Sequence, residues 1–182
     1  MKTNVIFEAF PFPPARFIGK TCTAVSGRKN PVIKELWDDF LYKGGKEFLE
    51  QRPGIRSPKG DCAGWMGEYN AQTKEFTYIV GSFFEPGCDV PEGYTYRDVP
   101  ACLMGVGKIR GKTQHLEGGA HNKTVKAMQA DGYEPDYSVG FSMEYYPYEQ
   151  YGMVEDNGEN ELEFHYYLPC RKKASADKET KE

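Results

Sequence analysis

The stretch YSVGFSMEYY, Tyr137–Tyr146, is the part of the sequence from which the fold can be worked out. With the later stretch ELEFHYYLPC, Glu161–Cys170, it has the aromatic-rich composition of a β-hairpin. The first half of the chain carries a similar pair, AGWMGEY (Ala63–Tyr69) and EFTYIVGSFF (Glu75–Phe84), with a turn between them. The sequence therefore predicts two pairs of strands, one in each half.

An amphipathic helix is predicted ahead of the first strand pair. Asn30-Pro31 is typical of an N-cap followed by proline at the first helical position. Apolar residues then recur at helical spacing, namely Ile33, Leu36, Trp37, Phe40 and Leu41. Gly44-Gly45 weaken this helix, which is expected to resume until Pro53. A shorter helix at about 122–131 is expected ahead of the second pair, after a loop at 111–123.

The order of the expected elements repeats. Each half consists of strand, helix, strand and strand, and a Pro-Ala step begins the first strand of each: Pro14-Ala15 and Pro100-Ala101. Pro100 also divides the long strand pattern Tyr94–Arg110. The halves are expected at about 5–86 and 94–173 of a single α+β domain, followed by a disordered charged tail at 174–182.

The composition excludes several classes of protein. The chain has 182 residues, 39% hydrophobic and 27% charged, which is typical of a globular domain. No apolar run is long enough to span a membrane, and the start has no secretory signal. A net charge of -4 argues against DNA binding by bulk electrostatics. Five cysteines without a CxxC pair favour a reducing cytoplasm over a disulfide framework.

The sequence lacks the common motifs of catalysis and cofactor binding. It contains no GxSxG and no GxxxxGK[ST], and Gly105-Val106-Gly107 lacks the third glycine of a dinucleotide fingerprint. The three histidines, His115, His121 and His165, are scattered without metal-ligand spacing. No cofactor and no metal site are therefore predicted.

Glu144 is the leading candidate for a functional residue. Alternation along the strand predicts that it shares a face with Gly140, Ser142 and Tyr146, opposite Val139, Phe141 and Met143. If the small-residue face lines a cavity, Glu144 is an acid at its floor and attracts a cation. Alignment of the two Met-containing strands places Trp65 in the same cavity. Further wall and donor candidates are Trp37, Tyr78, Tyr146 and Tyr167. The alternative is that Glu144 is a solvent-exposed glutamate of the strand and that the aromatic residues belong to the core.

Four segments give the chain a resemblance to a known family. They are IKELWDDF (Ile33–Phe40), FTYIVG (Phe76–Gly81), VPEGYTYRDVPA (Val90–Ala101), and SMEYYP with LEFHYYLPC (Ser142–Pro147 and Leu162–Cys170). In order and spacing they resemble the GyrI-like small-molecule-binding domains, the effector-binding domains of some AraC- and MerR-type regulators. The resemblance covers about residues 5 to 173.

The resemblance implies a duplicated βαββ architecture with a pseudo-twofold axis and a ligand cleft between the halves. It also implies that Glu144 occupies the position of the acid that binds lipophilic cations, and that Trp37 matches a helix tryptophan common in one branch. The second half departs from the family pattern, because its helix has no aromatic counterpart and 117–119 is glycine-rich. Too few residues precede the first strand for a helix-turn-helix domain, so a stand-alone ligand-binding domain is expected.

Three functions follow from these observations. The leading hypothesis is a cytoplasmic protein that binds aromatic compounds, cationic lipophilic ones included, for sequestration or sensing. The first alternative is a GyrI-like hydrolase of cyclopropanoid DNA-alkylating compounds, in which Glu144 acts on water. The second alternative is a topoisomerase inhibitor that uses the acidic residues Glu155-Asp156 and Glu159–Glu163. A protein partner and a homodimer both stay open.

Overall fold

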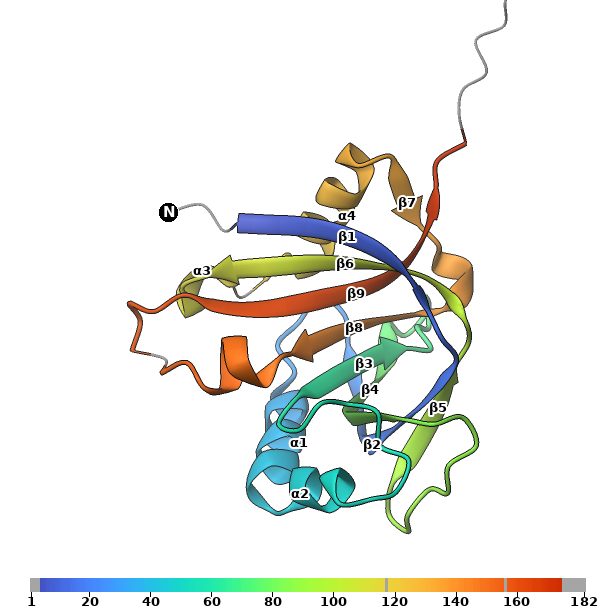
Figure 1. The fold of residues 1–182 in the computed structure, drawn as a ribbon, viewed down its shortest axis with the longest axis vertical. Coiled ribbons are helices and arrows are strands. Elements are labelled where there is room, and N and C mark those ends of the chain that lie inside the picture. Colours follow the sequence, from blue (N-terminus) through green and yellow to red (C-terminus); the bar gives the residue numbers. More distant parts are fainter. Residues whose placement is uncertain (1–3, 117, 156, 175–182) are drawn as a thin grey trace, which may run out of the picture.

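An antiparallel sheet runs through the whole molecule in the computed structural model, which describes residues 4–116, 118–155 and 157–174. The strand order is β1-β6-β9-β8-β3-β4-β2-β5, and a short β7 pairs with the end of β9 (Figure 1). The strands are β1 (Asn4–Phe12), β2 (Ala15–Val25), β3 (Cys62–Gly67), β4 (Glu75–Phe84), β5 (Thr95–Val99), β6 (Cys102–Gly111), β7 (Tyr133–Pro135), β8 (Phe141–Tyr146) and β9 (Leu162–Lys172).

The sheet is built from two similar halves. The helices are α1 (Pro31–Tyr42), α2 (Gly45–Glu50), α3 (Thr113–Leu116) and α4 (Ala120–Ala130). The first half runs β2, α1, β3, β4 and the second β6, α4, β8, β9, which confirms the predicted duplicated βαββ order. The two halves meet where β3 pairs with β8. The strand order is symmetric about this central pair.

Each half contributes one strand to the other half. β1 precedes β2 in the chain but pairs with β6 of the second half. β5 precedes β6 but pairs with β2 of the first half. The two exchanged strands are therefore the outer strands at opposite ends of the sheet order.

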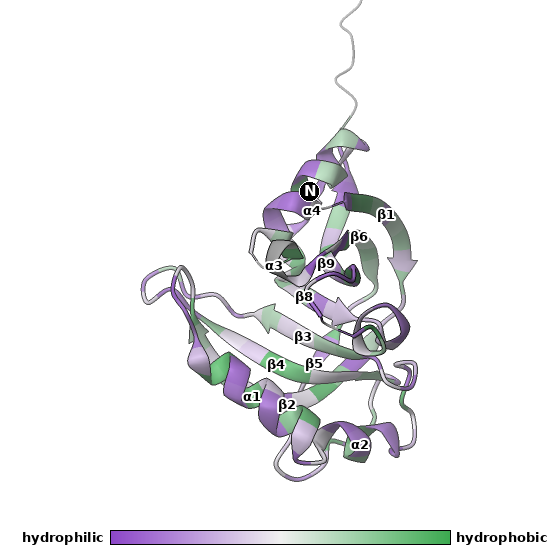
Figure 2. Cartoon of the chain, turned by 90° about the vertical axis from the view of Figure 1, so that its left-hand side faces the viewer, coloured by the Kyte–Doolittle hydropathy of each residue, from purple (hydrophilic) through white to green (hydrophobic). Residues whose placement is uncertain are grey.

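Both major helices cover the same face of the sheet. Figure 2 shows α1 and α2 along the β2–β4 part, and α4 beside β6 and β9. Phe40 of α1 and Leu49 of α2 are buried with Ile18, Val80 and other residues of the first half. Met128 of α4 is buried with residues of β6 and β9. A third cluster fills the opposite face, with Trp65, Met143 and Tyr145 among its members.

Some predicted boundaries are wrong at turns. The predicted strand Tyr137–Tyr146 begins only at Phe141, because Gly140 takes the left-handed φ of 85° after a 3₁₀ turn, η1 (Tyr137–Val139). The predicted loop 111–123 contains α3. The connection between β8 and β9 contains a helical turn, η2 (Tyr148–Gly152). Asn30 stands at the N-cap of α1, but its side chain does not cap the helix. Its amide group accepts a hydrogen bond from the backbone N–H of Val25 and donates one to the Val25 carbonyl oxygen.

The remaining predictions concern cysteines, membranes and the tail. All five cysteines are free. Within the described ranges, no helix has both the length and the apolar character needed to cross a bilayer. The predicted tail, apart from Ala174, lies outside the described residues.

Candidate functional site

The register between β3 and β8 decides which side chains share a face. Glu144 lies opposite Gly64, and Ser142 lies opposite Met66. Directly opposed residues of an antiparallel pair project from the same face of the sheet. Glu144, Ser142 and Met66 therefore face the side covered by α1 and α4, as the alternation along β8 predicted for Glu144.

Two tyrosines donate hydrogen bonds to the Glu144 carboxylate. The Tyr78 hydroxyl lies 2.9 Å and the Tyr146 hydroxyl 3.2 Å from Oε2 of Glu144. Trp37 of α1 in turn donates its indole N–H to the Tyr78 hydroxyl at 3.0 Å. The chain from Trp37 through Tyr78 to Glu144 thus connects the first helix to the strand of the second half.

Gly64 makes room for this arrangement. A Cβ atom at Gly64 would lie 2.1 Å from the Tyr78 hydroxyl oxygen, far inside van der Waals contact. Tyr78 can therefore cross β3 and reach Glu144 only because position 64 has no side chain.

Burial raises the pKa of Glu144 above its ordinary value of 4.5, and the two tyrosine hydrogen bonds partly oppose this rise. Burial and the nearby carboxylate also raise the pKa values of Tyr78 and Tyr146, so both stay protonated donors. Within the described part of the chain, Glu144 forms no ion pair. The carboxylate is thus desolvated without a cation to balance it.

Glu144 lines two adjoining cavities, and a third cavity continues from the second. The first, of about 580 Å³, is bordered by α1 and includes Trp37, Tyr78 and Glu144. The second, of about 430 Å³, shares Glu144, Tyr146 and Tyr151 with the first and is bordered by α4. The third, of about 730 Å³, shares Met66 and His121 with the second. The shared residues join the three into one groove, hereafter the cleft, across the junction of the halves.

The structure brings four of the six predicted site residues together. Glu144, Trp37, Tyr78 and Tyr146 form one connected group. The prediction that Trp65 faces the same cavity is wrong, because Trp65 lies opposite Met143 and is buried on the other face. Tyr167 also lies opposite Met143, and it stacks on Tyr145 on that other face.

The cleft also contains residues that were not predicted from the sequence. Tyr166 pairs with Glu144 across β8 and β9 and donates a hydrogen bond to Ser142 at 2.9 Å. His121 of α4 approaches the Tyr166 hydroxyl and lines the second and third cavities. Met66 lies between these cavities. Tyr166 and its neighbour Tyr167 project from opposite faces of β9, so only the pairing register between β8 and β9 could have shown that Tyr166 is the one that faces the cleft.

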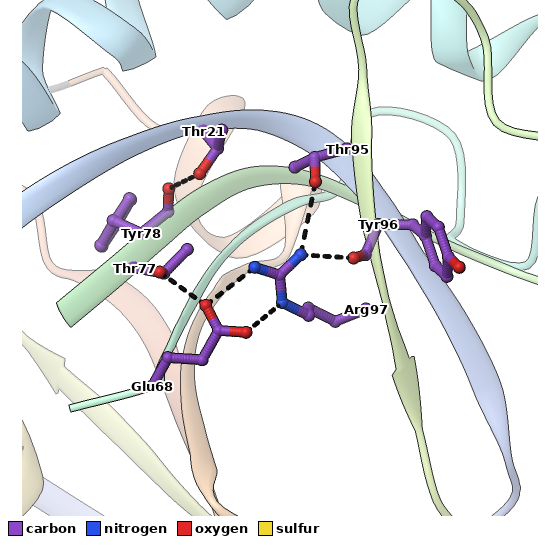
Figure 3. A network of polar contacts seen from close by, with 7 residues as sticks. All are labelled: Thr21, Glu68, Thr77, Tyr78, Thr95, Tyr96 and Arg97. Atoms are coloured by element: carbon purple, nitrogen blue, oxygen red, sulfur yellow. Dashed lines mark hydrogen bonds and ion pairs between the residues drawn. The ribbon is translucent and has the colours of Figure 1, made fainter. Parts of the chain in front are cut away.

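Another acidic residue at the cleft, Glu68, is already neutralised. Figure 3 shows the Glu68 carboxylate between Arg97 and Thr77. Arg97 of β5 holds both carboxylate oxygens, at 2.7 and 2.8 Å, and thereby lowers the pKa of Glu68. This bidentate pair links the exchanged strand β5 to the end of β3. Glu68 is therefore not available as a counter-charge for a bound cation.

Metal binding has no structural support in the described residues. Within 4–116, 118–155 and 157–174, no three histidine, cysteine, aspartate or glutamate side chains gather as a metal site.

Comparison with solved structures identifies the fold. SAV2435 bound to tetraphenylphosphonium matches with a TM-score of 0.66 at 11% identity, over 91% of this chain and 94% of that one. A putative transcription regulation protein from Staphylococcus aureus MU50 matches with a TM-score of 0.61 at 12% identity, over 91% and 98%. The EcmrR C-terminal domain matches with a TM-score of 0.54 at 12% identity, over 94% and 99%.

No protein-family model and no curated protein sequence matches the chain. The structural likenesses agree with the GyrI-like effector-binding fold that the sequence resembles, and the predicted fold is confirmed. At identities of 11% and 12%, the likeness is one of fold.

Proposed function

We propose that the protein binds lipophilic organic cations in the cleft, with the Glu144 carboxylate as the counter-charge. The observation that carries the proposal is a partly buried carboxylate that accepts hydrogen bonds from two tyrosines and, among the described residues, forms no ion pair; Lys34, which lines the same cavity, is paired with Asp38. A desolvated, unpaired charge is costly, and a cation that enters the cleft removes that cost.

The walls next to Glu144 suit an aromatic or quaternary cation. The rings of Trp37 and Tyr146 meet edge to face, with their centroids 5.2 Å apart. The centroid of the Tyr146 ring also lies 4.8 Å from that of Tyr151 and 5.8 Å from that of Phe164. Such surfaces bury apolar area and attract cations through their π faces. A strongly hydrated ion such as sodium gains little there, so the selectivity is for poorly hydrated organic cations.

The comparison with SAV2435 supports the same ligand class. That protein, similar in fold, is bound to tetraphenylphosphonium, which is a large aromatic cation. The likeness alone does not transfer a ligand, but the position of Glu144 in this chain offers the charge that such a ligand needs. Sequestration of the ligand and sensing of the ligand both require this binding step. The cytoplasmic location stays a prediction.

The test compares two ions of similar shape and opposite charge. Tetraphenylphosphonium and tetraphenylborate are titrated into the wild type, Glu144→Gln and a control, Glu134→Gln, whose residue pairs with Arg171 away from the cleft. The wild type and the control are expected to prefer the phosphonium, and Glu144→Gln to lose that preference. Equal affinities for both ions in the wild type would overturn the proposal.

A hydrolase is the second candidate, and the raised pKa of Glu144 favours it. A carboxyl group with a raised pKa is suited to proton transfer at neutral pH. Incubation with a strained cyclopropane substrate, followed by mass spectrometry, tests this function. A mass gain of one water with wild type, absent with Glu144→Gln, would indicate hydrolysis; an unchanged ligand would exclude it for that substrate.

A further inference from the structure

The cleft has two arms, which the pseudo-twofold axis relates but which differ in chemistry. One arm is lined by Trp37, Tyr78 and Glu144, and the other by Met66, His121 and Ser142. Tyr78 lies opposite Met66 in the first half, and Tyr166 lies opposite Glu144 in the second. Across the central pair, Glu144 and Met66 therefore occupy equivalent positions, as do Gly64 and Ser142. One arm carries a carboxylate where the other carries a thioether, so a symmetric ligand does not match both arms.

The arm without the carboxylate holds a connected series of neutral polar groups. Tyr166 donates its only hydroxyl proton to Ser142 at 2.9 Å. Its contact with Nδ1 of His121, at 3.4 Å, then requires the proton on that nitrogen. Nε2 of His121 is left as the acceptor for the Tyr137 hydroxyl at 3.2 Å. The series runs from Tyr137 through His121 and Tyr166 to Ser142.

Ser142 ends this series with a proton to donate. Its oxygen accepts from Tyr166, and in the described parts of the chain its own proton has no acceptor. Ser142 lines the largest of the three cavities together with His121 and Tyr137. A hydroxyl that accepts one hydrogen bond becomes a better donor of the next. This arm therefore offers a hydrogen-bond donor to a ligand.

We propose that the ligand is a cation that also carries a hydrogen-bond acceptor, such as a carbonyl oxygen, which binds the Ser142 hydroxyl. This inference rests on the proposed cation site at Glu144 and adds a second point of recognition. Ser142 and Glu144 are two residues apart on one face of β8, so their Cα atoms are about 7 Å apart and their side chains project side by side. The site thus selects an acceptor at that distance from the positive charge.

The electrostatics of this arm favour a neutral partner group. Burial lowers the pKa of His121 below its ordinary 6.5, so the imidazole is neutral at pH 7. Met66 adds a polarisable apolar contact at the position equivalent to Glu144. Neither group attracts a second cation or an anion.

The test uses three trimethylammonium compounds. The first is a phenyl ketone with four methylenes between carbonyl and nitrogen, which matches the spacing. The second replaces its carbonyl by a methylene. The third keeps the ketone but has a single methylene before the nitrogen. Dissociation constants are measured by isothermal titration calorimetry with the wild type, Ser142→Ala, Ser142→Thr and Glu144→Gln. Ser138→Ala, which removes a hydroxyl bonded to Asp136 outside the cleft, is the control.

The decisive quantity is the affinity of the matched ketone relative to its methylene analogue. We expect Ser142→Ala to lower this ratio about three- to tenfold, the value of one hydrogen bond, and Ser142→Thr and Ser138→Ala to preserve it. Glu144→Gln is expected to weaken both compounds alike and leave the ratio unchanged. The inference would be overturned if Ser142→Ala left this ratio unchanged, or if the wild type bound the short ketone as tightly as the matched ketone. If Glu144→Gln binds both compounds as tightly as the wild type, while Ser142→Ala still lowers the ratio, the result would instead contradict the cation site.

Discussion

Gly64 lies directly opposite Glu144 on the paired strands β3 and β8, and the Tyr78 side chain covers Gly64 to place its hydroxyl 2.9 Å from the carboxylate. The hydrogen bond to the acid thus depends on a missing side chain in the other half. The equivalent residue in the second half is Ser142, whose hydroxyl accepts a hydrogen bond from Tyr166. The same fold position is empty in one half and polar in the other.

Gly64→Ala is expected to displace Tyr78 from Glu144. The new methyl group meets the tyrosine hydroxyl at 2.1 Å, and overpacking of this kind costs about 1–3 kcal/mol. Urea denaturation measures the loss of stability, and tetraphenylphosphonium titration measures the loss of affinity. Ser142→Ala, at the equivalent position, is the matched control and is expected to be milder. Equal effects of the two substitutions would contradict this account.

Tyr78→Phe is expected to shift the pH dependence of cation binding. Cation affinity falls as the pH drops through the pKa of Glu144, because protonation removes the negative charge. Without the Tyr78 hydrogen bond, which lowers that pKa, the loss occurs at a higher pH. The variant also leaves the Trp37 indole N–H without its acceptor, at about 1 kcal/mol of stability. Tyr167→Phe, on the opposite face, is expected to leave the pH profile in place.

Glu144→Gln is expected to stabilise the ligand-free protein at neutral pH relative to the wild type. The folded-state pKa of Glu144 is raised above 4.5, so just above that pH this group binds more protons in the folded protein than in the unfolded chain. The contribution of Glu144 to stability therefore falls as the pH rises through this window. The advantage of the glutamine variant should grow from pH 4 to pH 7 in urea denaturation. A constant difference across the range would refute the assignment.

The two tryptophans are expected to respond differently to a ligand in the cleft. Trp37 lines the cleft, whereas Trp65 is buried on the opposite face. Binding of tetraphenylphosphonium should change the fluorescence of the wild type and of Trp65→Phe, but change it much less in Trp37→Phe. A signal that depends on Trp65 would place the ligand on the other face.

The sequence predicted the elements better than their register. The helix around Trp37 and the aromatic strands carry strong periodic patterns, and Pro100 marks the division between β5 and β6. The position of Glu144 on the cleft face followed from alternation along one strand. These features depend on local sequence, so they could be predicted from it.

The assignment of Trp65 failed because register is a long-range property. The sequence alignment treats Met66 and Met143 as equivalent residues of the two halves, but in the structure the residue equivalent to Met66 is Glu144, and a shift of one residue reverses the face of every side chain. Tyr166 and Tyr167 are adjacent, so the same uncertainty exchanged their faces. His121 joins the cleft only through the packing of α4, which no local pattern specifies.

The exchange of β1 and β5 between the halves has a consequence for how the chain can be divided. A fragment that ends after β4 keeps β1 but lacks β6, the strand with which β1 pairs. The complementary fragment keeps β5 but lacks β2. Each fragment alone therefore exposes unpaired backbone, whereas the two mixed together can interlock. Cutting the connection at 85–94 should give pieces that reconstitute a nicked molecule, with unfolding that depends on concentration.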